Sequence, residues 1–418
     1  MKKRFFVSMC LIAALLLGAC GSPKTEPDAG PSVSDDGDKT EKIQETVTVG
    51  INRDFQTMNP CASTVGVDSR VWYSVYEGLT TFDNDFNVIP RVAESWEQVD
   101  DRTLRFHLRD DVYFHNGDKL TPEDVIYSVK RCQALPSVAG ELDAIDVASC
   151  KVIDDKTVDI VTFEPYAPLL RSLTNPYVFL IVSESWCQQY GDDLSEHMMG
   201  TGPFKFVSRT VGDRVELERN DNYWGTVAKY KNLVFRVIPE STTRAIEVES
   251  EGIDVGQGIA INDVIRMQKE DKVDVTFINM PSICEISFNC QRAPFDNVKV
   301  RQAINYAIDM DAIVNAIYMG LQEVETSIIA SNVAGYYGGL EQYSYDPEKA
   351  KELLKEAGYE NGFDIEFKVA ENSDYVKCAE MIKNQLGAVG VNAVSYTHLD
   401  VYKRQIQDTV LHCSDNRR

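Results

Sequence analysis

The stretch that begins at Leu104 limits the fold more than any other part of the sequence, because strand and turn signals follow each other there directly. Leu104, Phe106 and Leu108 alternate with basic residues, the period-two pattern of a strand with one buried face. A second strand is predicted over residues 112–115, and it ends at Asn116-Gly117. This dipeptide favours a tight hairpin turn because both residues tolerate a positive φ.

Helix signals follow at once. Thr121 is predicted to cap a helix that has Pro122 at its first position and Asp124 three residues after the cap. Later helices are predicted from apolar stripes and polar starts over residues 297–308, from Asp309 onward, and from Asp346-Pro347 to a stop at Gly358.

A βαβ unit is predicted in the last third of the chain. Residues 363–369 alternate as a strand, a helix is predicted over 375–386, and a strand begins at Val391. Strands joined in this way lie parallel in one sheet. Residues 46–51 alternate as a further strand. The body from about Glu45 onward is too long for one small core, so two or more lobes of mixed sheet and helix are predicted.

The N-terminus predicts export and a lipid anchor. Residues 1–20 start with three basic residues, continue as a short apolar run and end in Leu-Gly-Ala-Cys. A run this short is typical of an export signal rather than a membrane span. The ending resembles a bacterial lipobox, in which the cysteine is diacylated, so Cys20 is the predicted lipidation site. Residues 21–45 are poor in large apolar residues and are interpreted as a flexible tether.

The charge excludes one class of partner. The formal net charge is −23, and it becomes −26 without residues 1–19, which carry three basic and no acidic side chains. A field of this sign repels nucleic acid and anionic lipid headgroups, so neither is an expected partner. Membrane attachment is therefore assigned to the predicted lipid alone.

No metal site, cofactor or catalytic residue is predicted. No two cysteines have Cys-x-x-Cys spacing, and His107 and His115 are interpreted as parts of a strand and a hairpin. The common hydrolase motifs Gly-x-Ser-x-Gly and His-Glu-x-x-His do not occur in the sequence. Trp96 and Trp224 are interpreted as core or lobe-packing residues.

Two pairs of cysteines define separate alternatives. Cys132 and Cys150 are predicted to be either a disulfide pair or two buried free thiols. Cys284 and Cys290 are predicted on one face of a strand, where about 20 Å would separate them and prevent a bridge.

Several long motifs then occur in an order typical of one family. They are residues 93–97, 103–109, 112–118, 121–125, 200–204, 222–225, 294–296 leading into 300–304, and the helix over 346–359. With these motifs the sequence resembles the solute-binding proteins of bacterial ABC importers, family 5, the oligopeptide, dipeptide and nickel type. The resemblance runs from about Val47 to Val394.

The resemblance implies an α/β, two-lobed periplasmic-binding-protein fold of type II. Its lobes would close on a ligand at a hinge. Residues 46–78 plus 200–280 are predicted as the core of lobe I, 79–199 as an extra subdomain of it, and 281–393 as an incomplete lobe II. The implied protein captures short peptides outside the cytoplasm, passes them to ABC permease and ATPase subunits, and works as a lipid-anchored monomer without enzyme activity.

Two segments are implied to touch the ligand. Val65-Gly66-Val67 corresponds to a lobe I segment whose backbone pairs with an extended peptide, and Gly66 would let another chain approach closely. The loop Ser373-Asp374-Tyr375 corresponds to a lobe II segment near the ligand's C-terminal end. In peptide-binding relatives an aspartate beyond the matched region anchors the ligand's amino group, so no residue of this sequence is assigned to that role.

The last residues form a separate hypothesis. Residues 394–405 can be encoded by codons that form an inverted repeat over nearly their whole length, similar to two sequencing adapters joined head to head. Residues 394–418 are therefore interpreted as a foreign tail that truncates the second lobe. A sheet that lacks later strands is expected to leave an exposed edge.

Other ligands and roles stay open at this point. The same fold serves for nickel or other metal chelates and for oligosaccharides, and a non-transporting surface receptor is a third alternative. The sequence does not distinguish the ligands.

Overall fold

The computed structural model describes residues 45–271, 273–278, 282–333, 335–369, 373–396 and 409–415. Cys20, the predicted export signal and nearly all of the predicted tether lie outside these residues. Among the helices of the described chain, none is both long and apolar enough to span a membrane. Two separate hydrophobic cores organise the chain, the first before residue 240 and the second after residue 290.

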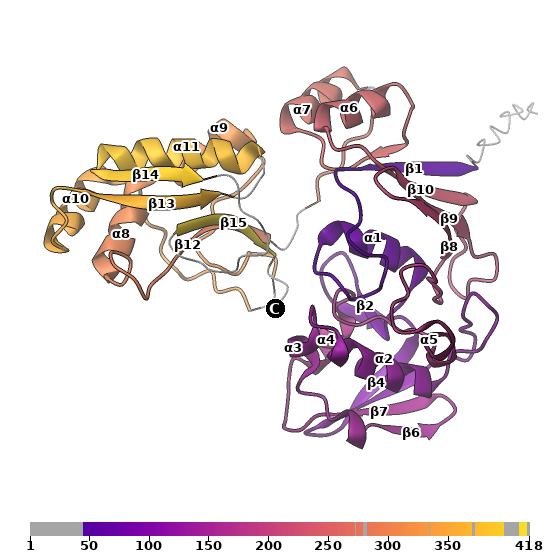
Figure 1. Ribbon diagram of the computed structural model, residues 1–418. Coiled ribbons are helices and arrows are strands. Elements are labelled where there is room, and N and C mark those ends of the chain that lie inside the picture. The colour runs from indigo at the N-terminus through magenta and orange to yellow at the C-terminus, as the bar shows by residue number, and fades with distance from the viewer. Residues whose placement is uncertain are drawn as a thin grey trace, which may run out of the picture. The chain divides into compact units, whose positions relative to one another are not determined.

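A five-stranded mixed sheet begins with the predicted strand at residues 46–51, which is confirmed. Its order is β11-β1-β10-β9-β8, with β1 parallel to β10 and β11, and with β9 antiparallel to β8 and β10. The strands are β1 (Thr46–Ile51), β8 (Phe204–Thr210), β9 (Arg214–Arg219), β10 (Asn232–Val237) and β11 (Val255–Gly256). Figure 1 shows β1 and β10 side by side, although nearly two hundred residues separate them in the sequence.

A four-stranded antiparallel sheet has the order β4-β5-β7-β6. Its strands are β4 (Ala93–Asp100), β5 (Thr103–Leu108), β6 (Lys151–Asp154) and β7 (Thr157–Val161), and a small pair, β2 (Thr80–Phe82) and β3 (Val88–Pro90), precedes it. The predicted strand at Leu104 is confirmed as β5, since Leu104, Phe106 and Leu108 are buried and the residues between them are half-buried.

The hairpin after β5 differs in part from its prediction. Residues 112–115 form only an isolated bridge from Tyr113 to Lys119, not a strand. The turn itself is present, because the Gly117 N–H donates to the Phe114 carbonyl at 2.8 Å. Of the two turn residues only Gly117 has a positive φ, of 93°. The segment is short because the His115 N–H donates outside the hairpin, to the Gly200 carbonyl, and because the next helix begins at Pro122.

The first core includes helices α1 (Gly66–Val75), α2 (Pro122–Ala134), α3 (Ala139–Leu142), α4 (Leu169–Thr174) and α5 (Glu184–Tyr190), with a 3₁₀ turn at Val147–Ser149. Outside this core, α6 (Ser241–Glu249) contacts β11, and α7 (Ile261–Glu270) contacts α6. The predicted start of α2 is confirmed. The Asp124 carboxylate accepts the Thr121 N–H at 2.9 Å, and Pro122 is the first helical residue.

The second core lies between a four-stranded mixed sheet and its helices. The strands are β12 (Ser282–Phe288), β13 (Phe363–Val369), β14 (Val391–Tyr396) and β15 (Thr409–Asp415), and the helices are α8 (Val298–Ala307), α9 (Met310–Tyr318), α10 (Pro347–Glu356) and α11 (Ser373–Ala388). The predicted βαβ unit is confirmed, since β13 and β14 pair in parallel and α11 connects them. Figure 1 shows α11 along these two strands.

The predicted starts of α8, α9 and α10 are also confirmed. The side chains of Asn297, Asp309 and Asp346 each accept a backbone N–H from the first turn of the helix that follows. Gly358, just past α10, has a φ of 85°, the left-handed conformation that ends a helix at low cost when the residue is glycine.

The sheet of the second core includes a strand from the predicted tail. The order is β12-β15-β13-β14, with β15 antiparallel to β12 and parallel to β13. Residues 409–415 thus lie between β12 and β13, and β12 and β14 are the outer strands of this sheet, so the exposed edge expected of a truncated lobe stays a prediction. Residues 397–408 lie outside the described residues, and the foreign origin of the tail stays a prediction.

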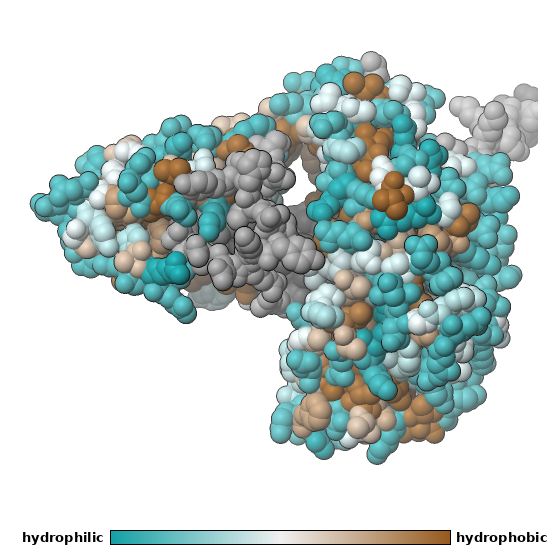
Figure 2. Space-filling view, in the orientation of Figure 1, coloured by the Kyte–Doolittle hydropathy of each residue, from teal (hydrophilic) through white to brown (hydrophobic). Residues whose placement is uncertain are grey.

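The first core is continuous across both of its large sheets. Ile51 and Phe235 from the five-stranded sheet belong to the same buried cluster as Phe106 and Ile160 from the antiparallel sheet. The predicted boundaries at residues 79 and 200 thus separate two sheets that share one core. On the surface, Figure 2 shows mainly hydrophilic residues with scattered hydrophobic ones on the face drawn, in keeping with the net charge of −23.

One cysteine alternative is decided and one cysteine prediction is corrected. Cys132 and Cys150 are two free thiols rather than a bridge, the second of the two alternatives, although Cys150 is only half-buried. Cys290 does not share a strand with Cys284, because β12 ends at Phe288. The apolar pattern that suggested a longer strand stops at a turn that leads to the cis peptide bond before Pro294.

Candidate ligand-binding segments

The first predicted ligand segment lies at the start of helix α1. Val65 is the N-cap, with the extended angles φ −81° and ψ 124°, whereas Gly66 and Val67 are already helical. The Val65 N–H donates to Ser63 Oγ at 2.9 Å, and its carbonyl accepts the Asp68 N–H at 3.1 Å. The implied extended pairing over three residues is therefore wrong in conformation, since a strand-like backbone is present only at Val65. A ligand role for Val65, Gly66 and Val67 stays a prediction.

A buried carboxylate, Asp68, fixes the loop that leads to this segment. Asp68 is fully buried, and its Oδ1 accepts the Gln56 N–H at 2.8 Å across twelve residues. Burial raises the pKa of the Asp68 carboxyl, against the lowering effect of the Ser63 hydroxyl and the Gln56 N–H. The loop between β1 and α1 is thus fixed at its far end by α1.

The near end of the same loop is fixed by strand β8. Asp54 accepts the Gly212 N–H at 2.8 Å and the Arg209 guanidinium at 3.2 Å. Arg209 also donates to the Phe55 carbonyl at 2.5 Å. These contacts join residues about 155 positions apart in the sequence, so the loop is set by tertiary contacts. It is a preformed frame of the kind that loses little entropy on binding.

The second predicted segment is the first turn of a helix, not a loop. Helix α11 begins at Ser373, two residues before the predicted start, so Asp374 and Tyr375 are helical. Lys377 Nζ donates to Asp374 Oδ1 at 3.0 Å, a contact between neighbouring turns. Tyr375 packs against the second core. A polar Ser-Asp start was the signal that could have placed the helix correctly. A ligand role for Ser373, Asp374 and Tyr375 stays a prediction.

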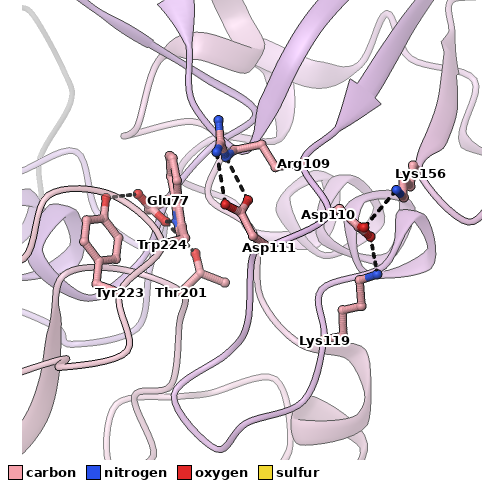
Figure 3. A network of polar contacts seen from close by, with 9 residues as sticks. All are labelled: Glu77, Arg109, Asp110, Asp111, Lys119, Lys156, Thr201, Tyr223 and Trp224. Carbon is pink, nitrogen blue, oxygen red and sulfur yellow. Dashed lines mark hydrogen bonds and ion pairs between the residues drawn. The ribbon is translucent and has the colours of Figure 1, made fainter.

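Glu77 is the residue of this lobe that sequence reasoning missed. Its carboxylate is buried and accepts three hydrogen bonds, from Tyr223 Oη at 2.7 Å, Trp224 Nε1 at 2.7 Å and Thr201 Oγ1 at 3.0 Å. The Arg91 guanidinium adds an ion pair at 2.7 Å. Figure 3 shows the three hydrogen-bond donors meeting at the carboxylate. Two of the sequence motifs, residues 200–204 and 222–225, therefore meet at Glu77.

Trp224 has a packing role at this point. The Arg109 guanidinium lies over its ring, 4.6 Å from the centroid, and Arg91 lies 5.5 Å from it. Arg109 in turn pairs with Asp111 at 3.0 Å (Figure 3). The guanidinium groups stack on the face of the Trp224 ring, and the indole N–H at its edge donates to Glu77. Trp224 therefore makes contacts through both its face and its edge. Trp96 also packs against the first core.

His115 links the hairpin to the turn at residues 200–203. Its Nε2 donates to the Gly202 carbonyl at 3.0 Å, and its Nδ1 accepts the Gly200 N–H at 3.4 Å. Burial, with a smaller effect of the Lys205 charge, lowers the pKa of His115 to about 4, so the ring is neutral at pH 7. Within the described residues, no group of three His, Cys, Asp or Glu side chains is placed to hold a metal ion.

Two α/β parts with separate cores, and mixed sheets flanked by helices, define the two-lobed periplasmic-binding-protein fold of type II. Solved structures agree. An ABC transporter-associated periplasmic binding protein from Helicobacter pylori, in complex with the peptide STSA, aligns with a TM-score of 0.78 at 28% identity, covering 88% of this chain and 78% of that one. NikA from Brucella suis, in complex with Fe(III)-EDTA, aligns with a TM-score of 0.79 at 26% identity, covering 89% and 79%.

Sequence comparison gives the family. Residues 87–401 match the description "bacterial extracellular solute-binding proteins, family 5 Middle". The chain is 32% identical over 346 residues to the dipeptide-binding protein of Escherichia coli, covering 74% of this chain and 63% of the relative. It is also 32% identical over 368 residues to heme-binding protein A of Haemophilus influenzae, covering 79% and 66%. The chain thus spans about two thirds of the length of these relatives. It belongs to the bacterial extracellular solute-binding proteins of family 5.

Proposed function

We propose that this chain is the solute-binding subunit of a bacterial ABC importer and that it captures short peptides outside the cytoplasm. The observation that carries the proposal is the family match over residues 87–401. In addition, one relative is named a dipeptide-binding protein, and one similar solved structure contains a bound tetrapeptide. The subunit binds without breaking a bond, works as a monomer, and passes its ligand to permease and ATPase subunits. The lipid on Cys20 holds it at the outer face of the cell membrane.

The described geometry supports binding by preformed segments. The loop that leads to Val65 is fixed by Asp54 at one end and by Asp68 at the other. Tyr375 stands on the rigid first turn of α11. Segments held in this way give affinity through main-chain and aromatic contacts at low entropic cost. Peptide side chains of different kinds then bind with similar affinity.

Isothermal titration calorimetry with pools of dipeptides to pentapeptides tests the proposal. The mature chain, with Cys20→Ser in place of the lipid, should give saturable heat. Tyr375→Ala should weaken binding about 10-fold or more, because it removes an aromatic contact next to the ligand. Tyr113→Ala is the matched control, an exposed tyrosine of the hairpin after β5, and should bind like the wild type. Thermal unfolding of each variant checks that it is folded.

Two outcomes count against this function. Absence of heat with every peptide pool contradicts peptide capture. Equal affinity of Tyr375→Ala and the wild type contradicts the predicted site in the second lobe, while peptide capture itself stands.

A metal chelate is the second candidate ligand, and the likeness to NikA from Brucella suis in complex with Fe(III)-EDTA favours it. Calorimetric titrations of the same protein with nickel–histidine and with iron–EDTA distinguish a chelate ligand from a peptide ligand. Heat from a chelate but not from peptides assigns the chain to chelate uptake. In the described residues no protein group of three metal-ligating side chains is present, so the chelator itself must supply most ligands.

A further inference from the structure

A turn before helix α1 brings one cysteine against another that is distant in sequence. The Ala62 N–H donates to the Asn59 carbonyl at 3.2 Å and closes the turn, in which Cys61 has a φ of 62°. This left-handed conformation favours glycine or asparagine, and other residues adopt it only where their surroundings hold them there. The presence of a cysteine at this position therefore calls for a role of its side chain.

The Cys61 side chain meets Cys132 of helix α2. Both residues are 0% exposed, and their thiols lie close enough to interact with each other. The other buried or half-buried thiols of the described chain have different neighbours. Cys150 bonds the Asp146 carbonyl and the Val161 N–H, Cys187 lies near Tyr127, and Cys378 lies 3.9 Å from Tyr318 Oη.

Two side chains hold the turn against the helix on either side of this contact. Arg131 Nη1 donates to the Pro60 carbonyl at 3.1 Å, and its Nη2 donates to Asn59 Oδ1. Ser137 Oγ donates to the Cys61 carbonyl at 2.8 Å. These hydrogen bonds fix the backbone of the turn next to Cys132, and the two thiols therefore stay close to each other.

The charge next to the pair favours thiol chemistry. Arg131 is buried beside both cysteines, and its positive charge favours their thiolate forms. The hydrogen bond from the Cys61 thiol and the Arg131 charge together lower the pKa of Cys132. A thiolate is the nucleophile of disulfide exchange, and attack by Cys132 first or by Cys61 first leads to the same bond.

We propose that Cys61 and Cys132 are the partners of an intramolecular disulfide that forms when the exported chain meets a disulfide oxidant. The Cys132 thiolate attacks the oxidant's disulfide and releases one thiol. The Cys61 thiolate then attacks the mixed disulfide at the Cys132 sulfur and releases the second thiol. The two cysteines lose two protons and two electrons, and the oxidant's disulfide is reduced to two thiols. Because both sulfurs are buried, exchange occurs before the turn packs on α2 or when it opens.

The bond would join the loop before α1 to helix α2. It closes about 70 residues of chain, and the loop that it fixes is the one that leads to Val65. The disulfide therefore stabilises the first lobe and the frame of the predicted ligand segment. The proposal rests on the proposed export for its oxidant, but not on the identity of the ligand.

Peptide mapping of the wild-type chain is the direct test. The protein is refolded in a glutathione/glutathione disulfide buffer, its free thiols are alkylated without reduction, and it is cut with trypsin and a glutamate-specific protease. The second enzyme cleaves after Glu141 and separates Cys132 from Cys150. The expected product is residues 54–70 linked to residues 132–141. Alkylated Cys61 and Cys132, or either of them linked to another cysteine, overturns the proposal.

Thermal unfolding with and without dithiothreitol gives a second readout. Reductant should lower the midpoint of the wild type by about 5 °C or more and leave Cys61→Ser unaffected. Cys187→Ser is the matched control, a buried thiol near Arg131 whose partner is a tyrosine, and its midpoint should fall with reductant as in the wild type. An equal response of Cys61→Ser and the wild type contradicts the proposal. Peptide binding is measured separately, so failure of the import function and failure of the disulfide are distinguishable.

Discussion

Glu77 concentrates the polar interactions of the first lobe on one buried carboxylate. Hydrogen bonds from Thr201, Tyr223 and Trp224 and the ion pair with Arg91 occupy both of its oxygens. The sequence supplied the motifs around these residues but not their meeting point, because more than 120 residues separate Glu77 from Thr201. Residue patterns report local geometry, and a buried polar network depends on the tertiary fold.

Replacement of Glu77 by glutamine tests this network. The amide keeps the shape, but it places an N–H₂ group where one oxygen accepts from two donors, and it removes the charge that pairs with Arg91. We expect Glu77→Gln to lower the free energy of unfolding by about 2–4 kcal/mol. Glu97→Gln is the control, since the Glu97 carboxylate is exposed and lies 3.6 Å from the His107 ring, and it should change the free energy of unfolding by less than about 0.5 kcal/mol. Urea unfolding followed by circular dichroism measures both, and equal stabilities would argue against the network.

Cysteine pairing shows a second limit at the residue scale. From the sequence, Cys132 and Cys150 were either a disulfide pair or two buried free thiols. The structure instead brings Cys132 to Cys61, and Cys150 bonds backbone groups of its own sheet region. Which sulfur atoms approach each other depends on how the loop before α1 packs on α2, and no local pattern encodes that packing.

Secondary-structure elements were predictable where local chemistry decides them. The caps at Asp309 and Asp346 and the capping interaction of Asp124 act within one turn of helix, and each prediction is confirmed. Predictions failed where an element depends on its neighbours. The hairpin strand at residues 112–115 is reduced to one bridge, and the backbone of residues 373–375 is helical. The segment at Val65 was predicted as extended, although Asp68 and its contact to Gln56 favour a helix start.

The link between the hairpin and the turn at residues 200–203 should make stability depend on pH. The pKa of His115 is about 4 in the folded protein and about 6.5 in an unfolded chain. Below pH 6.5 the unfolded state binds a proton that the folded state does not. The folded state therefore loses stability as the pH falls from about 6.5 to 4, by up to about 3 kcal/mol, and keeps its full stability above this window.

Urea unfolding between pH 4 and 7 checks this prediction. The wild type should lose more stability over the window than His115→Gln, which cannot titrate. His107→Gln, which changes a half-buried histidine on β5, is the control and should keep the pH dependence of the wild type. An unchanged pH dependence in His115→Gln would show that the ring does not carry the effect.

At the scale of the whole molecule, the class of fold was predictable from the sequence, but the extent of its cores was not. Length and the βαβ pattern predicted two α/β lobes, and the family motifs over residues 93–304 placed most elements in order. The continuity of the first core across two sheets was not predictable, because it depends on how residues far apart in the sequence, such as Ile51 and Phe106, come to share one buried cluster. The position of β15 between β12 and β13 was not predicted either, since the tail was interpreted as foreign.

The central claim is that two lobes close around a ligand without chemical change to it. Small-angle X-ray scattering of the mature protein, with and without saturating peptide, tests this claim most directly. The account predicts that the radius of gyration falls on addition of a bound peptide and returns to its starting value when the peptide is dialysed away, with the peptide recovered intact. A radius of gyration that is unchanged by a peptide shown by calorimetry to be bound, or recovery of a cleaved peptide, would contradict it.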